Sequence, residues 1–224
     1  MERQYSRQLK NSLSKLLFPP VCVHCGTKIT SQKEFLCQRC LNSIGFIEPL
    51  LEKSDLECNY DNLITICKYR KVVVSMIHEL KYYGMPSIGK YIAQIIYKRL
   101  VECNLELDID VITSVPLHFV KEKERGYNQS SLIASELALL MQCDYSGKLI
   151  ERVTYTASQA TLEHDERLDN LKKAFKLKKN IDLNNKTIVL LDDVFTTGTT
   201  VDHCCSELKK ANPKNIIVLT MGRA

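Results

Sequence analysis

Apolar residues recur along the chain with two different periods, which predict an alternation of strands and helices. Four apolar runs predict strands, and the last two of them are continuous: Leu63–Tyr69, Asp110–Val115, Thr187–Leu191 and Ile216–Met221. Apolar positions at helical spacing predict four helices: Val72–Tyr83, Ile88–Leu100, Tyr127–Met141 and about Thr199–Ala211. Continuous apolar strands that alternate with helices are typical of a parallel sheet buried on both faces. We therefore expect an α/β fold with a parallel sheet flanked by helices.

Four weaker segments complete this pattern. Leu149–Val153 and Phe175–Leu177 predict short strands, the second at a sheet edge, and the polar segment Thr154–Asn170 between them predicts a mobile loop. Near the start of the chain, Tyr5–Phe18 has leucines at helical spacing with basic residues nearby, and Pro19 follows it. This pattern predicts an amphipathic helix. We expect it to pack on the protein, with a peripheral contact to the inner membrane as the alternative.

The composition is that of an ordinary globular protein. The 224 residues are 45% hydrophobic and 25% charged, which allows one domain with a sizeable core and a small extra module. The net charge of +5 permits an anionic partner without requiring one. The first residues are polar, and no apolar run approaches the ~18–20 residues of a membrane span. We therefore expect a cytoplasmic protein; a peripheral contact of the N-terminal helix with the cytoplasmic face of the membrane is the alternative.

Four of the ten cysteines form two CxxC pairs, at Cys22 with Cys25 and at Cys37 with Cys40. In a reducing compartment such pairs indicate a tetrahedral zinc site rather than disulfides. Four protein ligands leave no open position, so we expect the zinc to be structural. His24 is an alternative ligand, but the set of four cysteines is complete without it. Few apolar residues lie between the pairs, and we expect the metal to replace a core in this segment.

The stretch Thr187–Thr200 reads TIVLLDDVFTTGTT and joins a buried strand to a helix N-terminus. Because ligands bind at the carboxyl ends of the strands in open α/β sheets, we expect Asp192 and Asp193 to lie in a ligand site. Free backbone N–H groups and hydroxyls follow in Thr196–Thr200, where Gly198 lets the backbone approach closely. This loop is suited to a phosphate monoester. The carboxylates are suited to accept hydrogen bonds from a vicinal diol or to hold magnesium through water, and neither role needs a shifted pKa.

A phosphate beside a diol describes a ribose 5-phosphate. The chain has neither GxxxxGK[ST] nor GxGxxG, which argues against a P-loop NTPase and a dinucleotide fold. The acid pair and the loop after it resemble the phosphoribosyl-pyrophosphate (PRPP) signature of type I phosphoribosyltransferases. The resemblance implies that Asp192 and Asp193 hold the ribose hydroxyls and that magnesium accompanies the pyrophosphate. It also implies PRPP contacts from six further residues: Val194, Thr196, Thr197, Gly198, Thr199 and Thr200.

Three further blocks and the cysteine quartet resemble the ComF family of competence proteins, which are phosphoribosyltransferase-like proteins of DNA uptake. The blocks are Lys81-Tyr-Tyr-Gly84, then Val115-Pro-Leu-His118 with Lys121 and Arg125-Gly-Tyr-Asn-Gln129, and then Gln159 with Arg167-Leu-Asp-Asn170 and Ala174-Phe175. The resemblance implies a type I phosphoribosyltransferase-like sheet with a small N-terminal zinc module. It also implies a role in natural transformation, with single-stranded DNA and competence helicase or uptake proteins as partners.

Three basic side chains are candidates for binding the pyrophosphate. Lys121 and Arg125 follow the strand Asp110–Val115 in a loop that we expect at the carboxyl edge of the sheet. Arginine suits phosphate oxygens because it donates two parallel hydrogen bonds. Arg167 is the candidate ligand from the loop Thr154–Asn170, which we expect to close over the site and exclude water.

The sequence leaves three functions open. The first is a PRPP-binding protein of DNA uptake; if it transfers the ribosyl group, Asp192, Asp193 and Arg125 are its candidate catalytic residues, with Arg125 and magnesium stabilising the departing pyrophosphate. The second is a non-catalytic sensor of PRPP or a nucleotide that binds single-stranded DNA. The third is a phosphoribosyltransferase that salvages a purine or another base. No segment reads as a base pocket, and no platform of aromatic and basic residues for stacked DNA bases is visible.

We expect three parts along the chain. Residues 1–20 form the amphipathic helix, residues 21–46 form the four-cysteine zinc module, and residues 47–224 form the phosphoribosyltransferase-like domain. These bounds follow from the proline pair that ends the first segment and from the connector of mixed charge that begins at Ile47.

Overall fold

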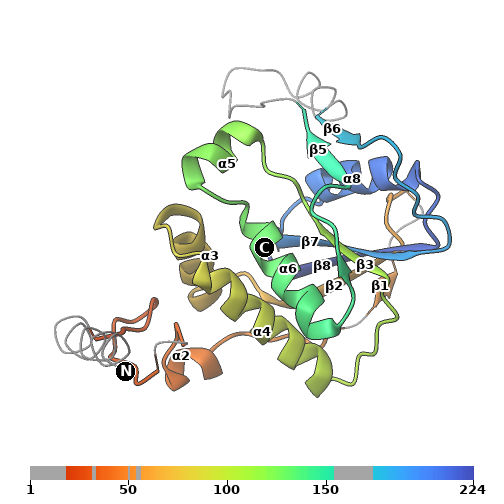
Figure 1. Ribbon diagram of the computed structural model, residues 1–224. Coiled ribbons are helices and arrows are strands. Elements are labelled where there is room, and N and C mark those ends of the chain that lie inside the picture. The colour runs from red at the N-terminus through yellow and green to blue at the C-terminus, as the bar shows by residue number, and fades with distance from the viewer. Residues whose placement is uncertain (1–18, 32–33, 50, 54–56, 154–173) are drawn as a thin grey trace, which may run out of the picture.

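The computed structural model describes residues 19–31, 34–49, 51–53, 57–153 and 174–224, and its centre is a six-stranded sheet (Figure 1). The strand order is β1-β2-β8-β7-β3-β4, and each neighbouring pair is parallel except β1 with β2. The strands are β1 (Glu52–Lys53), β2 (Asn62–Lys68), β3 (Val111–Ser114), β4 (Asp144–Tyr145), β7 (Thr187–Phe195) and β8 (Asn215–Arg223). The predicted α/β fold is confirmed, with one antiparallel strand at the edge of the sheet.

Both faces of this sheet are covered (Figure 1). Three helices lie on one face: α3 (Val72–Tyr82), α4 (Ser87–Glu102) and α6 (Gln129–Met141). On the other face lie α8 (Thr199–Lys209) and a two-stranded antiparallel sheet, β5 (Ile150–Arg152) with β6 (Phe175–Leu177). Val189 and Leu191 of β7 belong to the first buried cluster, and Ile188 and Leu190 belong to the second. Because β7 is buried on both faces, its sequence is a continuous apolar run.

Two aspartates fix the register of the central strands at their amino ends. Asp110, just before β3, accepts a hydrogen bond from the backbone N–H of Thr187 at 2.7 Å. Asp61, just before β2, accepts one from the backbone N–H of Ile216, also at 2.7 Å. A slip of one residue would exchange the two faces of a strand, so these bonds help to set which side chains reach the carboxyl edge.

The strand β7 is longer than the sequence predicts. Its pairing with β8 continues past Leu191, through Asp192 opposite Thr220 and on to Phe195 opposite Arg223. The two acidic side chains are therefore part of a paired strand and not the first residues of a loop. The polar side chains suggested that the strand ends before Asp192. The hydrogen bonds between strands are made by backbone N–H and C=O groups, however, and every residue except proline offers both.

Several short elements were absent from the predicted pattern. The segment after β3, expected as a loop, contains the helix α5 (Phe119–Arg125), none of whose residues is buried. Without an apolar face, α5 leaves no periodic signal in the sequence. The helix α2 (Gln38–Asn42) and the strands β1 and β4 are too short to show a period. The helix α6 begins two residues later than predicted because Asn128 caps it, accepting a hydrogen bond from the backbone N–H of Ser130.

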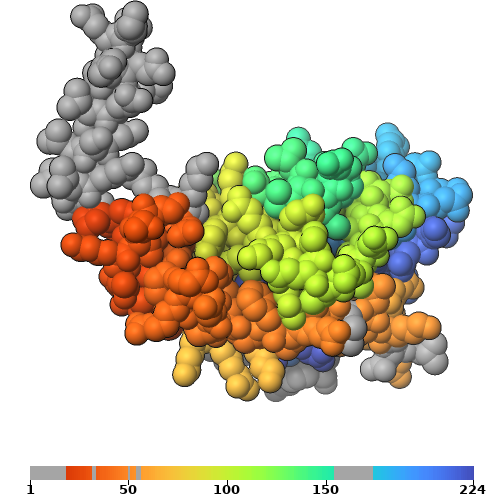
Figure 2. Space-filling view, turned by 90° about the horizontal axis from the view of Figure 1, so that it is seen from below, coloured from red at the N-terminus to blue at the C-terminus, as the bar shows by residue number. Residues whose placement is uncertain are grey.

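The cysteine-marked segment packs directly on α3 and α4, as Figure 2 shows for the red-to-orange residues beside the yellow-green helices. Cys22, Leu36, Cys40 and Ile44 belong to the same buried cluster as those two helices. The segment therefore shares the main core of the protein. We expected a bound metal to take the place of a hydrophobic core in this segment. That expectation is wrong in one respect, because the buried residues of the segment pack against the apolar side chains of α3 and α4. The domain boundary at residue 46 stays a prediction.

Two predicted segments lie outside the described residues: the helix Tyr5–Phe18 and the loop Thr154–Asn170 with Arg167. Within the part of the chain that the structure describes, no helix is long and apolar enough to cross a membrane. The cytoplasmic location stays a prediction.

Candidate functional site

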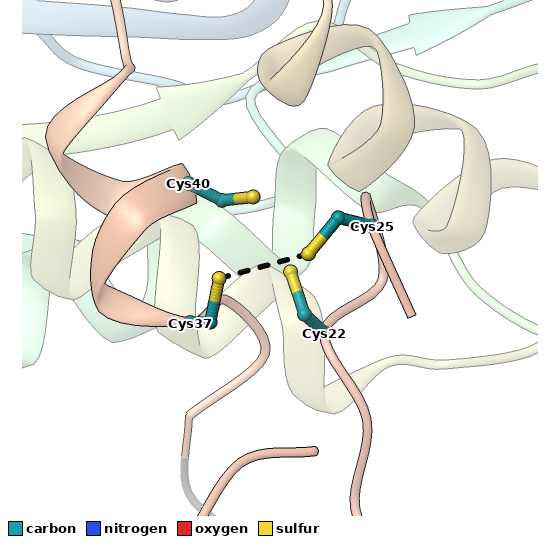
Figure 3. A group of neighbouring side chains, drawn as sticks. All are labelled: Cys22, Cys25, Cys37 and Cys40. Atoms are coloured by element: carbon teal, nitrogen blue, oxygen red, sulfur yellow. Dashed lines mark hydrogen bonds between the residues drawn. The ribbon is translucent and has the colours of Figure 1, made fainter. Parts of the chain in front are cut away.

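The four cysteines of the two CxxC pairs converge on one point (Figure 3). Their Sγ atoms all lie within 4.8 Å of one another, and those of Cys25 and Cys37 are 3.7 Å apart. Four thiolates at ~2.3 Å from a zinc ion stand about 3.8 Å apart, so the cluster fits a tetrahedral site. His24 is not part of the cluster; its Nδ1 instead forms a 2.8 Å hydrogen bond with the hydroxyl of Ser75 on α3. The chemistry of this donor set indicates a structural zinc.

The acid pair lies near the carboxyl end of β7, where the two side chains meet different partners. Asp193 is 3% exposed, and its Oδ2 is 2.5 Å from the Nζ of Lys81 at the end of α3. Asp192 is partly buried, and its Oδ1 accepts hydrogen bonds from the Ser130 hydroxyl at 3.0 Å and from the backbone N–H of Asp193 at 2.9 Å. A lysine and the first turn of α6 thus hold the two carboxylates in place.

The two carboxylates also interact electrostatically. Burial, together with the neighbouring charge of Asp193, raises the pKa of Asp192 to about 8. Hydrogen bonds from the backbone of Asp193 and from Ser130 act in the opposite direction but do not outweigh burial. The sequence suggested two plain acceptors without a shifted pKa. Burial and the neighbouring carboxylate instead favour the protonated form of Asp192.

The loop after the acid pair begins the helix α8. Gly198 is the N-cap residue of α8 with φ of 77°, and a Cβ atom added there would lie 2.7 Å from the ring of Phe195. Both facts require glycine at this position. The hydroxyls of Thr197 and Thr199 are 3.0 Å apart. Backbone N–H groups at a helix N-terminus attract anions, so the loop offers a phosphate both donors and a favourable dipole.

Two adjoining cavities connect the acid pair with this loop. The larger, of about 310 Å³, is lined by both aspartates and by Val194, Thr196 and Thr200. The smaller, of about 40 Å³, is lined by Asp192 and Gly198 and shares Thr196 and Thr200 with the first. The larger cavity is also lined by seven residues that the sequence did not assign to the site, among them Lys81, Gln129 and Arg152. Lys81 and Gln129 lie in quoted motif blocks, whereas Arg152 lies at the end of β5 without any motif.

Lys121 and Arg125 lie in a separate cavity. It measures about 500 Å³ and is also lined by Lys81, Tyr82 and Glu124. The guanidinium of Arg125 donates a hydrogen bond to Gln129 and lies 5.8 Å from the ring centroid of Tyr82. Neither basic residue lines the cavity of the acid pair. Lys81 lines this cavity as well as the larger cavity at the acid pair.

A model of the phosphoribosyl transferase domain matches residues 84–222, which include the acid pair and the threonine loop. The chain belongs to this family. A model of the double zinc ribbon domain matches residues 13–51 and therefore contains the whole cysteine cluster. These two matches confirm the type I phosphoribosyltransferase-like fold and the N-terminal four-cysteine ribbon that the sequence motifs implied.

The similarity to named relatives extends over most of the chain. Competence protein F of Haemophilus influenzae is 28% identical over 213 residues, which cover 92% of this chain and 85% of that protein. DNA utilization protein YhgH of Salmonella typhi is 31% identical over 185 residues, or 81% of this chain and 80% of that protein. These relatives confirm the resemblance to ComF-family proteins. A crystal structure of adenine phosphoribosyltransferase from Saccharomyces cerevisiae aligns with a TM-score of 0.39 and 14% identity over 62% of this chain and 72% of that one.

Loss of the metal should destabilise the whole protein, because the cysteine cluster shares a core with α3 and α4. We expect purified protein to carry one zinc ion per chain. The Cys25→Ala variant should lose this ion and melt at least about 5 °C lower, a shift expected for a loss of ~2 kcal/mol at this size. Cys143→Ala is the control, since Cys143 lies outside the cluster. Metal analysis with thermal melting tests this, and a Cys25→Ala variant with a full zinc content would contradict it.

The raised pKa of Asp192 gives stability a pH dependence with a definite sign. The folded state holds this proton more tightly than the unfolded state, so the contribution of Asp192 to stability falls as pH rises from about 4 towards about 8. Asp192→Asn removes this effect. The melting temperature of the variant minus that of the unmodified protein should therefore increase between pH 5 and pH 8. A difference that stays constant or decreases over this range would contradict the assignment.

Proposed function

We propose that this protein binds PRPP at the carboxyl edge of the sheet and acts in DNA uptake during natural transformation. The proposed binding of PRPP is supported by one observation: the acid pair and the threonine loop line two adjoining cavities. In this assignment the 5-phosphate lies on the backbone N–H groups and hydroxyls of Thr196–Thr200. The ribose hydroxyls donate hydrogen bonds to Asp192 and Asp193.

The pyrophosphate of the ligand is assigned to the cavity of Lys121 and Arg125. Their positive charges complement its oxygens, and the guanidinium of Arg125 is already oriented by Gln129 and Tyr82. Asp193 is paired with Lys81, so we assign the ligands of magnesium to pyrophosphate oxygens and water. When bound, magnesium would neutralise part of the charge on the pyrophosphate. If the protein transfers the ribosyl group, Arg125 would stabilise that charge as the pyrophosphate departs.

The role in DNA uptake rests on the relatives, whose names describe competence and DNA utilization. We place the protein in the cytoplasm, where competence helicase or uptake proteins are its candidate partners. A base-salvage phosphoribosyltransferase is the alternative. Release of pyrophosphate from PRPP in the presence of hypoxanthine, guanine or adenine would favour that alternative over a non-catalytic PRPP sensor.

Binding of PRPP should depend on the acid pair. We expect calorimetry with magnesium to give measurable affinity for the unmodified protein. The isosteric variant Asp192→Asn/Asp193→Asn should weaken it at least about a hundredfold, because both carboxyl groups that accept hydrogen bonds from the ribose hydroxyls are lost. Asp144→Asn, on the exposed edge strand β4, removes one acidic side chain far from the site and serves as control. Equal affinity in the double variant and the control would rule out the ribose assignment.

Single-stranded DNA is the second ligand that we propose, and a specific surface favours it. Tyr82 and Tyr83 at the end of α3 are 67% and 63% exposed, and Arg125 lies beside the first of them. The sequence alone did not suggest this combination of aromatic and basic side chains, because α5 brings Arg125 there from a distant part of the chain. Exposed aromatic rings beside basic side chains are typical of sites that stack DNA bases.

Affinity for an oligothymidine should therefore fall with salt and with loss of the two rings. Neutralised phosphates release counterions, so the logarithm of the association constant should decrease linearly with the logarithm of the salt concentration. Tyr82→Ala/Tyr83→Ala should weaken binding about tenfold or more at fixed salt, as the loss of one or two stacked bases implies. Tyr145→Ala, which removes an exposed ring on β4, is the control. Fluorescence anisotropy measures both effects, and equal affinity in the two variants would contradict the proposed surface.

A further inference from the structure

Lys81 connects the two cavities that the proposed function assigns to a single ligand. Its side chain lines the cavity of the acid pair and also the cavity of Lys121 and Arg125. Its position is well fixed at the end of α3. The hydroxyl of Tyr127 donates a 2.6 Å hydrogen bond to the carbonyl of the preceding residue, Leu80. The lysine thus borders both spaces that a ligand of the two cavities would occupy.

Without a ligand, the ammonium of Lys81 compensates the charge of Asp193. The carboxylate is buried, and a buried carboxylate is costly unless a cation or several hydrogen bonds satisfy it. The side chain of Lys81 itself is 24% exposed, so its end borders the open part of the site. A lysine has three N–H donors on a flexible stem and is able to bind two acceptors at once.

A bound ribose diol would change how the charge of Asp193 is compensated. Hydroxyls that donate hydrogen bonds to Asp193 supply part of the compensation that Lys81 provides in the free protein. One or two donors of the ammonium then become available to another acceptor. A ribose 5-phosphate offers no anion in the second cavity. A ribose that also carries a diphosphate on its anomeric carbon extends towards that cavity, where Lys121 and Arg125 already give a positive potential.

We propose that Lys81 is the residue that lets this site distinguish a ribose 5-phosphate that carries a diphosphate from one that does not. This proposal rests on the proposed function. In the free protein the ammonium pairs with Asp193, and in the complex it shares its donors between Asp193 and the diphosphate. The lysine thereby favours PRPP over the same sugar phosphate after loss of its diphosphate.

The test compares two ligands in calorimetry, PRPP with magnesium and ribose 5-phosphate with magnesium. In Lys81→Met the affinity for PRPP should fall about tenfold or more relative to that for ribose 5-phosphate, a loss of ~1.4 kcal/mol or more of discrimination. Lys90→Met is the matched control. Lys90 is a largely exposed lysine on α4 that pairs with Glu136 at 3.5 Å, so its loss removes the same charge away from the site.

Lys81→Met leaves the buried carboxylate of Asp193 without its cation, so this variant could lose affinity only because the site is distorted. A second pair of variants removes this difficulty. Asp193→Asn and Lys81→Met/Asp193→Asn both lack the buried carboxylate. The ratio of the affinity for PRPP to the affinity for ribose 5-phosphate should be about tenfold lower in the double variant than in Asp193→Asn. Equal losses for both ligands in the variants without Lys81 would show that the lysine only supports Asp193, and would overturn this proposal alone. If the unmodified protein binds neither ligand, the proposed function fails and this proposal fails with it.

Discussion

Two adjacent carboxylates within the stretch of β7 that pairs with β8 are the constraint on which the rest of the site depends. The pairing of β7 with β8 continues beyond Asp192 and Asp193, so neither residue is able to turn away into solvent. Each carboxylate must be satisfied by another element. Lys81 reaches Asp193 from α3, and Ser130 reaches Asp192 from the first turn of α6. The acid pair thereby fixes the positions of two helix ends at the carboxyl edge of the sheet.

The same helix α3 connects the ligand site with the cysteine cluster. Ser75 on α3 is hydrogen-bonded to His24, which lies between two cysteines of the cluster, and Lys81 follows less than two turns later on the same helix. Cys22 and Cys40 belong to the buried cluster that contains the apolar face of α3. The cysteine cluster and the acid pair thus both contact α3, the first near its amino end and the second near its carboxyl end.

Much of this architecture could be predicted because burial leaves a pattern in the sequence. The apolar runs of β7 and β8 and the periodic faces of α3, α4 and α6 identified the α/β sheet, and the spacing of the cysteines identified the cluster. The helix α5 could not be predicted, because none of its residues is buried. The roles of Lys81 and Ser130 could not be predicted either. Their partners lie 112 and 62 residues away along the chain, and only the folded sheet brings them together.

The most direct test of the account is a crystal structure of the protein with PRPP and magnesium. We expect the 5-phosphate on the backbone N–H groups of Thr196–Thr200 and the ribose hydroxyls within hydrogen-bond distance of Asp192 and Asp193. We also expect the diphosphate between Lys81 and Arg125. A complex in which the phosphate avoids the N-terminus of α8, or in which the ribose makes no contact with either aspartate, would contradict it.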